Sequence, residues 1–276
     1  MNKALERGAG ILLPISSLPS PYGIGTMGKD AYEFVDMLKR AGQKYWQVLP
    51  IGPTSFGDSP YQSFSAFAGN PYFIDLDTLI EEGLLTKEEV EFYKWADSDD
   101  EIDYARLYRQ RFEVLRKAFG RSEHKDSRGY ADFIKENEQW IDDYALYMAI
   151  KDDHNNREWL AWEPAIKKRK PEAMAAYREK LGEDVEFYKF LQFKFYEQWM
   201  PLKEYANRNG ISIIGDIPIY VALDSADVWA NTDQFQLSGS LAPAVVAGCP
   251  PDMFSSYGQK WGNPIYDWDV MEKDDF

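Results

Sequence analysis

Cysteine and histidine are scarce in this sequence of 276 residues. Cys249 is the only cysteine, so no disulfide can form within the chain, and we expect a protein of the reducing cytoplasm. The two histidines, His124 and His154, show no metal-ligand spacing. The sequence therefore predicts no disulfide framework and no metal site. No motif for a cofactor is present either.

Long apolar runs and positive charge are also lacking. No stretch approaches the length of a membrane span, and the N-terminus has no apolar signal core. The 31 Lys and Arg residues are outnumbered by 46 Asp and Glu, which gives a formal net charge of −15. Because so acidic a surface repels phosphate backbones, we expect no nucleic acid as a partner. The lack of a membrane span predicts no membrane.

Aromatic residues, by contrast, are abundant: nine Trp, 18 Tyr and 16 Phe. Most of them are expected in the core. Aromatic side chains gathered in loops suit ligands that have apolar faces and polar edges, and sugars are such ligands. No Ser-His-Asp arrangement, phosphate loop or dinucleotide fingerprint points to a competing function.

A βαβ unit is predicted near the start of the chain. Residues 9–15 and 45–51 have the apolar, β-branched composition of buried strands. Between them, residues 29–41 carry apolar side chains at helical spacing, and Gly42 ends the predicted helix. This order predicts a parallel pair of strands with a right-handed crossover.

Residues 77–208 change character. Their aromatic and aliphatic residues recur at i, i+3 and i+4, with charges on the other faces, which predicts a helical insertion whose stripes form a helix–helix core. A third buried strand follows at 211–214, and Asp216 comes directly after it. A carboxylate at a strand end is typical of the mouth of an α/β barrel, although a surface Asp that caps the next turn has the same pattern. The segment 221–264 is again rich in Gly, Pro, Ser and aromatics.

Each of the three strands is followed by a loop with residues suited to sugar recognition. These are Ser16, Ser17, Tyr22 and Gly25 in the first; Asp58, Ser59, Tyr61 and Gln62 in the second; and Asp216, Asp224, Asp227, Trp229, Asp252, Phe254, Gln259, Trp261 and Asn263 in the third. In an α/β barrel all three loops meet on one face. Carboxylates and amides bind hydroxyl groups, while aromatic rings cover the apolar face of a pyranose.

Four long motifs resemble the amylomaltases, the bacterial 4-α-glucanotransferases also called disproportionating enzymes. They are L-P-I-S-S-L-P-S-P-Y-G-I-G, D-S-P-Y-Q-S-F-S-A-F-A-G-N-P-Y-F-I, G-D-I-P-I-Y-V-A-L-D-S-A-D-V-W and G-C-P-P-D-M-F-S-S-Y-G-Q-K-W-G-N-P-I-Y-D-W. The resemblance implies transfer of α-1,4-glucan segments between maltooligosaccharides by a retaining mechanism with a covalent glycosyl-enzyme. It also implies a (β/α)8 barrel of the α-amylase type, with about three of the eight strands in this chain.

The fold class expected from the resemblance is therefore α/β, the N-terminal part of a TIM barrel with a helical insertion between strands 2 and 3. Three segments are expected. Residues 1–76 hold the first two barrel strands and their substrate loops, 77–208 the mainly helical insertion, and 209–276 the third strand and an active-site lid loop.

The same resemblance assigns roles to the predicted site residues. Tyr61 and Asp216 are expected to line the donor subsite. Asp252, Phe254, Gln259 and Trp261 belong to a mobile loop that covers the cleft, contacts the acceptor and disfavours water as acceptor. Ser59 and Asn263 complete the expected substrate-binding set.

One feature of the family is missing from the sequence. The nucleophile of the family is an Asp in an R-I-D-H-F-R-type strand after this region, with the acid/base Glu and a stabilising Asp further on. No such motif occurs before Phe276. We therefore expect the N-terminal part of the enzyme, without catalytic residues and inactive by itself. A related α-glucan hydrolase or debranching enzyme, or a non-catalytic carbohydrate-binding protein, is the alternative; the lid motif at 248–261 favours the transferase.

Overall fold

The computed structural model describes residues 7–55, 57–98 and 100–275. The chain forms two compact units, each assembled from three separate segments. Unit 1 comprises Met1–Ile51, Gly69–Phe133 and Phe190–Ile217, and unit 2 comprises Gly52–Ala68, Ile134–Lys189 and Pro218–Phe276. Two helices, α5 and α9, contribute residues to both units.

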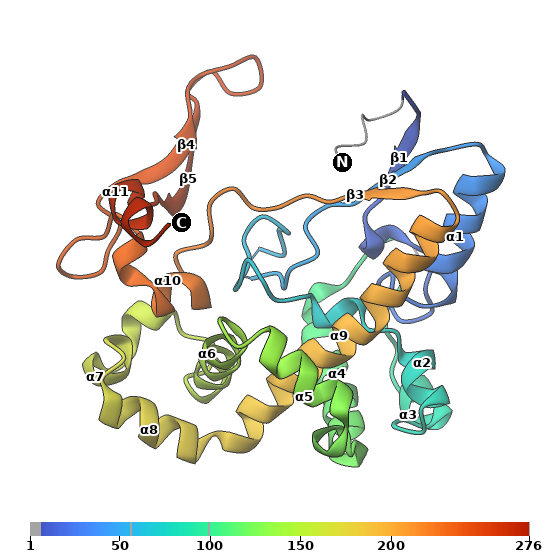
Figure 1. The fold of residues 1–276 in the computed structure, drawn as a ribbon, viewed down its shortest axis with the longest axis horizontal. Coiled ribbons are helices and arrows are strands. Elements are labelled where there is room, and N and C mark those ends of the chain that lie inside the picture. The colour runs from blue at the N-terminus through green and yellow to red at the C-terminus, as the bar shows by residue number, and fades with distance from the viewer. Residues whose placement is uncertain (1–6, 56, 99, 276) are drawn as a thin grey trace. The chain divides into compact units, whose positions relative to one another are not determined.

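Helices dominate the middle of the chain, while the strands lie near its two ends (Figure 1). The strands are β1 (Gly10–Leu12), β2 (Tyr45–Gln47), β3 (Ser212–Ile214), β4 (Val246–Cys249) and β5 (Gln259–Pro264). The α-helices are α1 (Lys29–Arg40), α2 (Leu76–Glu81), α3 (Lys87–Glu91), α4 (Tyr104–Arg121), α5 (Arg128–Glu136), α6 (Ile141–Asp153), α7 (Pro164–Lys167), α8 (Pro171–Lys180), α9 (Gly182–Arg208), α10 (Ala226–Ala230) and α11 (Trp268–Met271). Within the described ranges, every helix falls short of the length or the apolarity that a bilayer crossing requires.

Three parallel strands form the sheet of unit 1, in the order β1–β2–β3 (Figure 1). Trp46 in the central strand pairs with Ile11 on one side and with Ile213 on the other. Helix α1 packs on β2, where the rings of Phe34 and Trp46 lie 5.1 Å apart and Trp46 is fully buried. The predicted parallel pair is thus confirmed, and the predicted helix 29–41 matches α1 to within one residue.

The first and third strands were wrongly predicted to be buried. Each spans only three residues, and Leu12 is 53% and Ile214 42% exposed. Both strands lie at the edges of the sheet, with β2 as their paired neighbour. Their apolar side chains on the face opposite Trp46 therefore remain open to solvent in unit 1, although parallel sheets are usually covered on both faces.

An antiparallel hairpin of β4 and β5 in unit 2 was not predicted from the sequence. Its register shifts between Val246 and Gly248, so the side chains do not alternate in the simple way that marks a strand. Gly248 lies so close to β5 that a Cβ atom would come within 2.3 Å of the carbonyl oxygen of Gln259. Gly248, one of the glycines that suggested a loop, is therefore required for close strand pairing.

Two buried glutamines of α9 hold irregular backbone in unit 1. The Gln192 amide accepts a hydrogen bond from the Gly69 N–H at 2.7 Å and donates to the Gly69 carbonyl at 3.0 Å. Gln198 pairs in the same way with Asp75, at 2.7 and 3.2 Å. Each amide takes the place of a neighbouring strand, because buried backbone groups need hydrogen-bond partners.

The segment between these two clamps is also held from α4. Arg111 is fully buried and donates to the carbonyl oxygens of Tyr72 at 2.7 Å and Ile74 at 3.0 Å. Burial lowers the pKa of the Arg111 guanidinium to about 10, partly opposed by the charge of Asp75. Residues 69–75 are therefore fixed by polar side chains of two helices, although they form only one short 3-10 turn.

The Gln198 clamp gives a stability prediction. Replacing Gln198 with Leu keeps the side-chain volume but leaves the buried N–H of Asp75 unpaired and removes one hydrogen bond to its C=O, so we expect a loss of about 2 kcal/mol in unfolding free energy. Urea unfolding followed by circular dichroism measures it. The control is Gln110→Leu, because the Oε1 of Gln110 is buried without a hydrogen-bond partner among the described residues. If both variants lose the same unfolding free energy, the proposed role of Gln198 in holding Asp75 is contradicted.

Candidate functional site

The second predicted sugar loop forms a closed turn in unit 2. The Gln62 N–H donates to the Ser59 carbonyl at 3.1 Å, and the Ser55 N–H donates to the Gln62 carbonyl at 2.9 Å. The Tyr61 N–H donates to Ser59 Oγ at 3.3 Å. Ser59 therefore shapes the turn, and Tyr61 presents an exposed aromatic ring at its surface.

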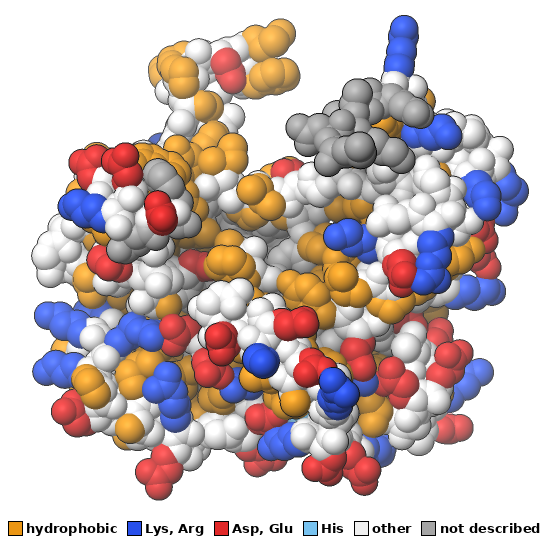
Figure 2. Space-filling model, viewed as in Figure 1, with side chains coloured by type: hydrophobic (Ala, Val, Ile, Leu, Met, Phe, Trp, Pro, Cys, Tyr) orange, Lys and Arg blue, Asp and Glu red, His pale blue; other side chains and the backbone are white. Residues whose placement is uncertain are grey.

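The hairpin of β4 and β5 carries apolar side chains that are held out in solvent. At its tip, Asp252 Oδ1 accepts hydrogen bonds from the N–H groups of Phe254 and Ser255, each at 2.8 Å, which forms an Asx turn. Met253, Phe254 and Tyr257 are 90%, 86% and 96% exposed. Figure 2 shows these orange side chains grouped around a red one at the tip of the hairpin. Clustered exposed apolar groups mark surfaces that meet a ligand or a partner.

Two further predicted residues lie on β5. Gln259 and Trp261 are two positions apart, so their side chains point to the same side of the strand. The indole Nε1 of Trp261 donates to Gln259 Oε1 at 3.0 Å. This bond fixes the edge of an indole ring that is 45% exposed, and leaves the ring face available for stacking.

Asn263, near the end of β5, differs from the other predicted residues because it is only 5% exposed. Its Nδ2 donates to the carbonyl oxygens of Tyr220 at 3.1 Å and Val221 at 3.0 Å. Its Oδ1 accepts from Gln62 Nε2 at 3.0 Å. The base of the hairpin, the loop that carries Tyr61 and the segment at 220–221 therefore meet at one amide.

Asp216 lies in unit 1, two residues beyond the end of β3. It is half-buried, and its Oδ1 accepts a hydrogen bond from the Ile217 N–H at 2.9 Å. Thus Asp216 sits at a strand end as the sequence predicted. The other residues of the expected substrate-binding set belong to unit 2, while Ser16, Ser17, Tyr22 and Gly25 of the first predicted loop lie in unit 1.

Two residues of the third predicted loop serve the interior of unit 2 instead. Trp229 is fully buried, and its Nε1 donates to the Ile166 carbonyl at 3.2 Å. Asp224 accepts hydrogen bonds from the Tyr147 hydroxyl at 2.6 Å and from the Trp159 N–H at 3.1 Å. Fully buried Trp229 has no surface for a sugar, so its grouping with the sugar ligands was wrong, while sugar recognition by Asp224 stays a prediction.

Lys151 of α6 is a further partner of Asp224, and this contact was not predicted from the sequence. Its Nζ lies 2.5 Å from Asp224 Oδ2, and the residue is 1% exposed. Burial, followed by the nearby charge of Asp224, holds the pKa of the Tyr147 hydroxyl well above its usual value. The sequence does contain a signal: Lys151 ends the apolar run 144–150, and a lysine in a helix buried on all sides needs a carboxylate partner.

Asp227 anchors the same loop in a different way. Its Oδ2 accepts a hydrogen bond from the Ala66 N–H at 3.0 Å, and the Ala226 N–H donates to the Phe64 carbonyl at 2.8 Å. Burial raises the pKa of the Asp227 carboxyl to about 6, although the Ala66 N–H and its own N–H oppose the shift. The loops 52–68 and 218–231 are thus joined at a second point.

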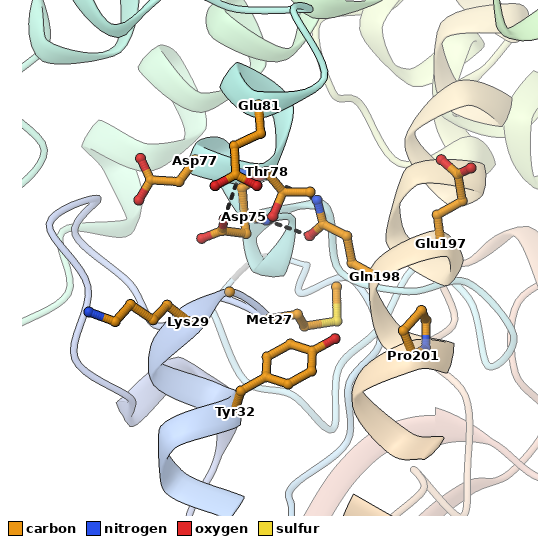
Figure 3. A pocket seen from close by; sticks show the side chains of 11 residues that line it. Met27, Lys29, Tyr32, Asp75, Asp77, Thr78, Glu81, Glu197, Gln198 and Pro201 are labelled. Atoms are coloured by element: carbon orange, nitrogen blue, oxygen red, sulfur yellow. Dashed lines mark hydrogen bonds between the residues drawn. The ribbon is translucent and has the colours of Figure 1, made fainter. Parts of the chain in front are cut away.

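A cavity of about 410 Å³ lies elsewhere, in unit 1 (Figure 3). Its wall is made by the start of α1, by α2 and by the middle of α9, and it includes Tyr32, Asp75, Glu81, Glu197 and Gln198. None of the predicted site residues lines it. In its wall, the Gln198 side-chain amide is hydrogen-bonded to the backbone N–H and C=O of Asp75 (Figure 3). These two residues therefore stabilise the fold.

Within the part of the chain that the structure describes, no group of three or more His, Cys, Asp or Glu side chains is arranged to hold a metal ion. Exposed aromatic rings on two elements of unit 2 and half-buried carboxylates match the polar edges and apolar faces of sugars.

Comparison with known proteins agrees with this reading of the residues. The family model described as 4-alpha-glucanotransferase matches residues 13–276. A 4-alpha-glucanotransferase of Clostridium butyricum is 55% identical over 263 residues, which cover 95% of this chain and 54% of the relative. That of Thermus thermophilus is 47% identical over 276 residues, which cover 99% of this chain and 54% of the relative.

A solved structure is also closely similar. The amylomaltase from Streptococcus agalactiae in complex with acarbose superposes with a TM-score of 0.94 at 46% identity, over 98% of this chain and 55% of that one. The α/β fold of this protein is thus of the amylomaltase type. The chain belongs to the 4-α-glucanotransferase family. It spans about half the length of the curated relatives that it matches.

The raised pKa of Asp227 gives a prediction about pH. Between about pH 4 and 6 the folded protein holds a proton that the unfolded chain has released, so the contribution of this carboxyl to stability falls as the pH rises through that window. Asp227→Asn keeps an oxygen for the Ala66 N–H but cannot ionise. We expect this variant to be more stable than the parent at pH 7, by about 2 kcal/mol, and equally stable near pH 4.

Urea unfolding at several pH values measures this difference. The control is Asp233→Asn, an exposed aspartate nearby in the same unit, which should change the unfolding free energy by less than about 0.5 kcal/mol. The account of Asp227 is contradicted if the difference in unfolding free energy between Asp227→Asn and the parent is the same at pH 7 as at pH 4.

Proposed function

We propose that this chain binds α-1,4-glucans and forms part of a 4-α-glucanotransferase that transfers glucan segments between maltooligosaccharides. The three parallel strands are, in this proposal, part of a (β/α)8 barrel, in which loops at the carboxyl ends of the strands carry the chemistry. The open faces and edges of β1 and β3 support it, because parallel sheets are otherwise covered. The single cysteine suits action in the cytoplasm.

The observation that carries the proposal is the hairpin of β4 and β5. Its tip keeps Met253, Phe254 and Tyr257 almost fully exposed on a turn that is fixed by Asp252. Exposed apolar side chains are unfavourable in water unless they cover something. A sugar chain under such a lid is shielded from water, and a glycosyl intermediate then passes to another sugar in preference to water.

The remaining residues divide between two subsites. The family resemblance assigns Tyr61 and Asp216 to the donor subsite: Tyr61 offers an exposed aromatic ring for the apolar face of a sugar, and Asp216 offers a carboxylate for hydroxyl groups. Gln259 and Trp261 contact the acceptor from the lid. Ser59 contributes by holding Tyr61 in its turn.

A retaining mechanism requires a nucleophilic carboxylate and an acid/base carboxyl about 5 Å apart. The resemblance to the family places the nucleophile in an R-I-D-H-F-R-type strand and the acid/base Glu further on, and neither motif occurs in these residues. On that ground we assign binding to this chain and no catalytic residue within it. Asp216 acts as a ligand for hydroxyl groups and not as the nucleophile.

The stacking role of Trp261 is testable by binding. We expect Trp261→Ala to weaken the binding of maltoheptaose about tenfold, or about 1.4 kcal/mol, because a ring face that covers a glucosyl unit is lost. Isothermal titration calorimetry measures the dissociation constant. Trp268→Ala is the matched control, since Trp268 is a tryptophan of the same unit that is 54% exposed. A core role for Trp261 would instead appear as a lower melting temperature with unchanged affinity.

Catalysis by the 276 residues themselves is the second test. We expect no turnover when the purified polypeptide is incubated with maltotriose, because no free carboxyl pair is assigned within it. Chromatography of the sugars detects glucose and longer oligomers. Chain lengthening that is abolished by Asp216→Asn or Asp252→Asn would place catalytic groups within this chain and contradict the assignment. Glucose without longer products would identify a hydrolase.

A further inference from the structure

Asn263 is the one predicted sugar ligand whose amide is fully occupied by the protein itself. Both N–H groups of its Nδ2 have carbonyl acceptors, those of Tyr220 and Val221. Its Oδ1 receives the amide of Gln62. At 5% exposure it has little surface left for a sugar. A buried amide with its donors and acceptor in use is costly to disturb, because each lost bond leaves an unpaired buried group.

The three segments that meet at Asn263 carry the residues of the proposed site. Gln62 directly follows Tyr61 in the closed turn. Tyr220 and Val221 begin the loop that continues to Asp224, which is anchored on Lys151. Asn263 itself lies two residues after Trp261 on β5. One side chain of β5 therefore binds both the loop with Tyr61 and the loop at 218–226, and so ties the base of the lid to each of them.

The segments lack other regular structure that would hold them together. The turn 55–62 closes on itself, and the bridge between Thr54 and Ser63 lies at its own base. The Phe64 and Ala66 backbone binds residues 226 and 227, but neither contact involves β5. The hairpin has its own two strands. In such irregular backbone, the free energy that fixes one loop against another comes from side-chain hydrogen bonds.

We propose that Asn263 is a positioning residue: with Gln62 it fixes the lid base and the Tyr61 loop in one arrangement before sugar binds, and it makes no contact with the sugar. The proposal rests on the proposed function for the identity of the ligand. Its structural part, the coupling of the loops, concerns the free protein. Preorganised loops bind more tightly because less ordering remains to be done when the ligand arrives.

Segment-resolved hydrogen–deuterium exchange of the free chain tests the coupling. In Asn263→Ala, we expect amides in both 55–63 and 218–226 to exchange about tenfold faster than in the parent chain. In Gln62→Ala, only the segment 55–63 should respond, because the bonds from Asn263 to Tyr220 and Val221 remain. Gln62 is partly exposed, so this variant should fold even if Asn263→Ala does not.

Two controls separate positioning from general destabilisation. Asn231→Ala removes an exposed amide of unit 2 that donates to the Asp227 carbonyl at 3.2 Å, and it should leave both segments unchanged. Gln198→Ala removes a clamp of unit 1 and lowers stability without touching these loops. If Gln198→Ala accelerates exchange in 55–63 as much as Gln62→Ala does, the effect is general loss of stability, and the proposal fails.

Titration with maltoheptaose measures the effect of the same variants on sugar binding. We expect about tenfold weaker binding by Asn263→Ala and a smaller loss for Gln62→Ala. Weaker binding by Asn263→Ala with unchanged exchange would mean a direct sugar contact and would overturn the proposal, as would no change in either measurement. If the parent chain itself binds no maltoheptaose, the proposed function fails, and the exchange experiment still decides whether Asn263 couples the loops.

Discussion

Buried backbone that belongs to no helix or sheet must still find hydrogen-bond partners, and this requirement shapes both units of the protein. In unit 1, Gln192 and Gln198 pair with the N–H and C=O groups of residues 69 and 75, as a neighbouring strand would. In unit 2, the Asn263 amide donates to the carbonyl oxygens of residues 220 and 221. Side-chain amides suit this task because each carries donors and an acceptor on one planar group.

The same requirement divides the polar residues of the loops into two groups. Asp224 and Asn263 are saturated by protein partners and hold the loops in place. Tyr61, Phe254 and Trp261 are exposed on elements whose backbone is already fixed. In this account the first group forms the frame and the second meets the sugar, and rigid support of an exposed ligand-binding residue is what affinity demands.

Much of the fold was predictable because it rests on local periodicity. Helix α1 was predicted because apolar side chains recur at helical spacing and Gly42 follows them. The parallel pairing of β1 and β2 was predicted because this helix connects two apolar runs. The hairpin of β4 and β5 was not predictable in this way, because Gly248 and a register shift remove the alternation of side chains. The candidate site came from motifs, which identify residue types but not their partners. Trp229 and Asp224 were therefore grouped with sugar ligands, while the lysine that holds Asp224 went unnoticed.

The most direct test of this account is a crystal structure of the chain with bound maltoheptaose. The account predicts electron density for glucosyl units against the rings of Tyr61 and Trp261, with Asp216 on sugar hydroxyl groups and the bonds of Asn263 to Gln62, Tyr220 and Val221 unchanged. Glucosyl units bound instead in the cavity beside Tyr32 and Glu197, or hydrogen-bonded to the amide of Asn263, would contradict it.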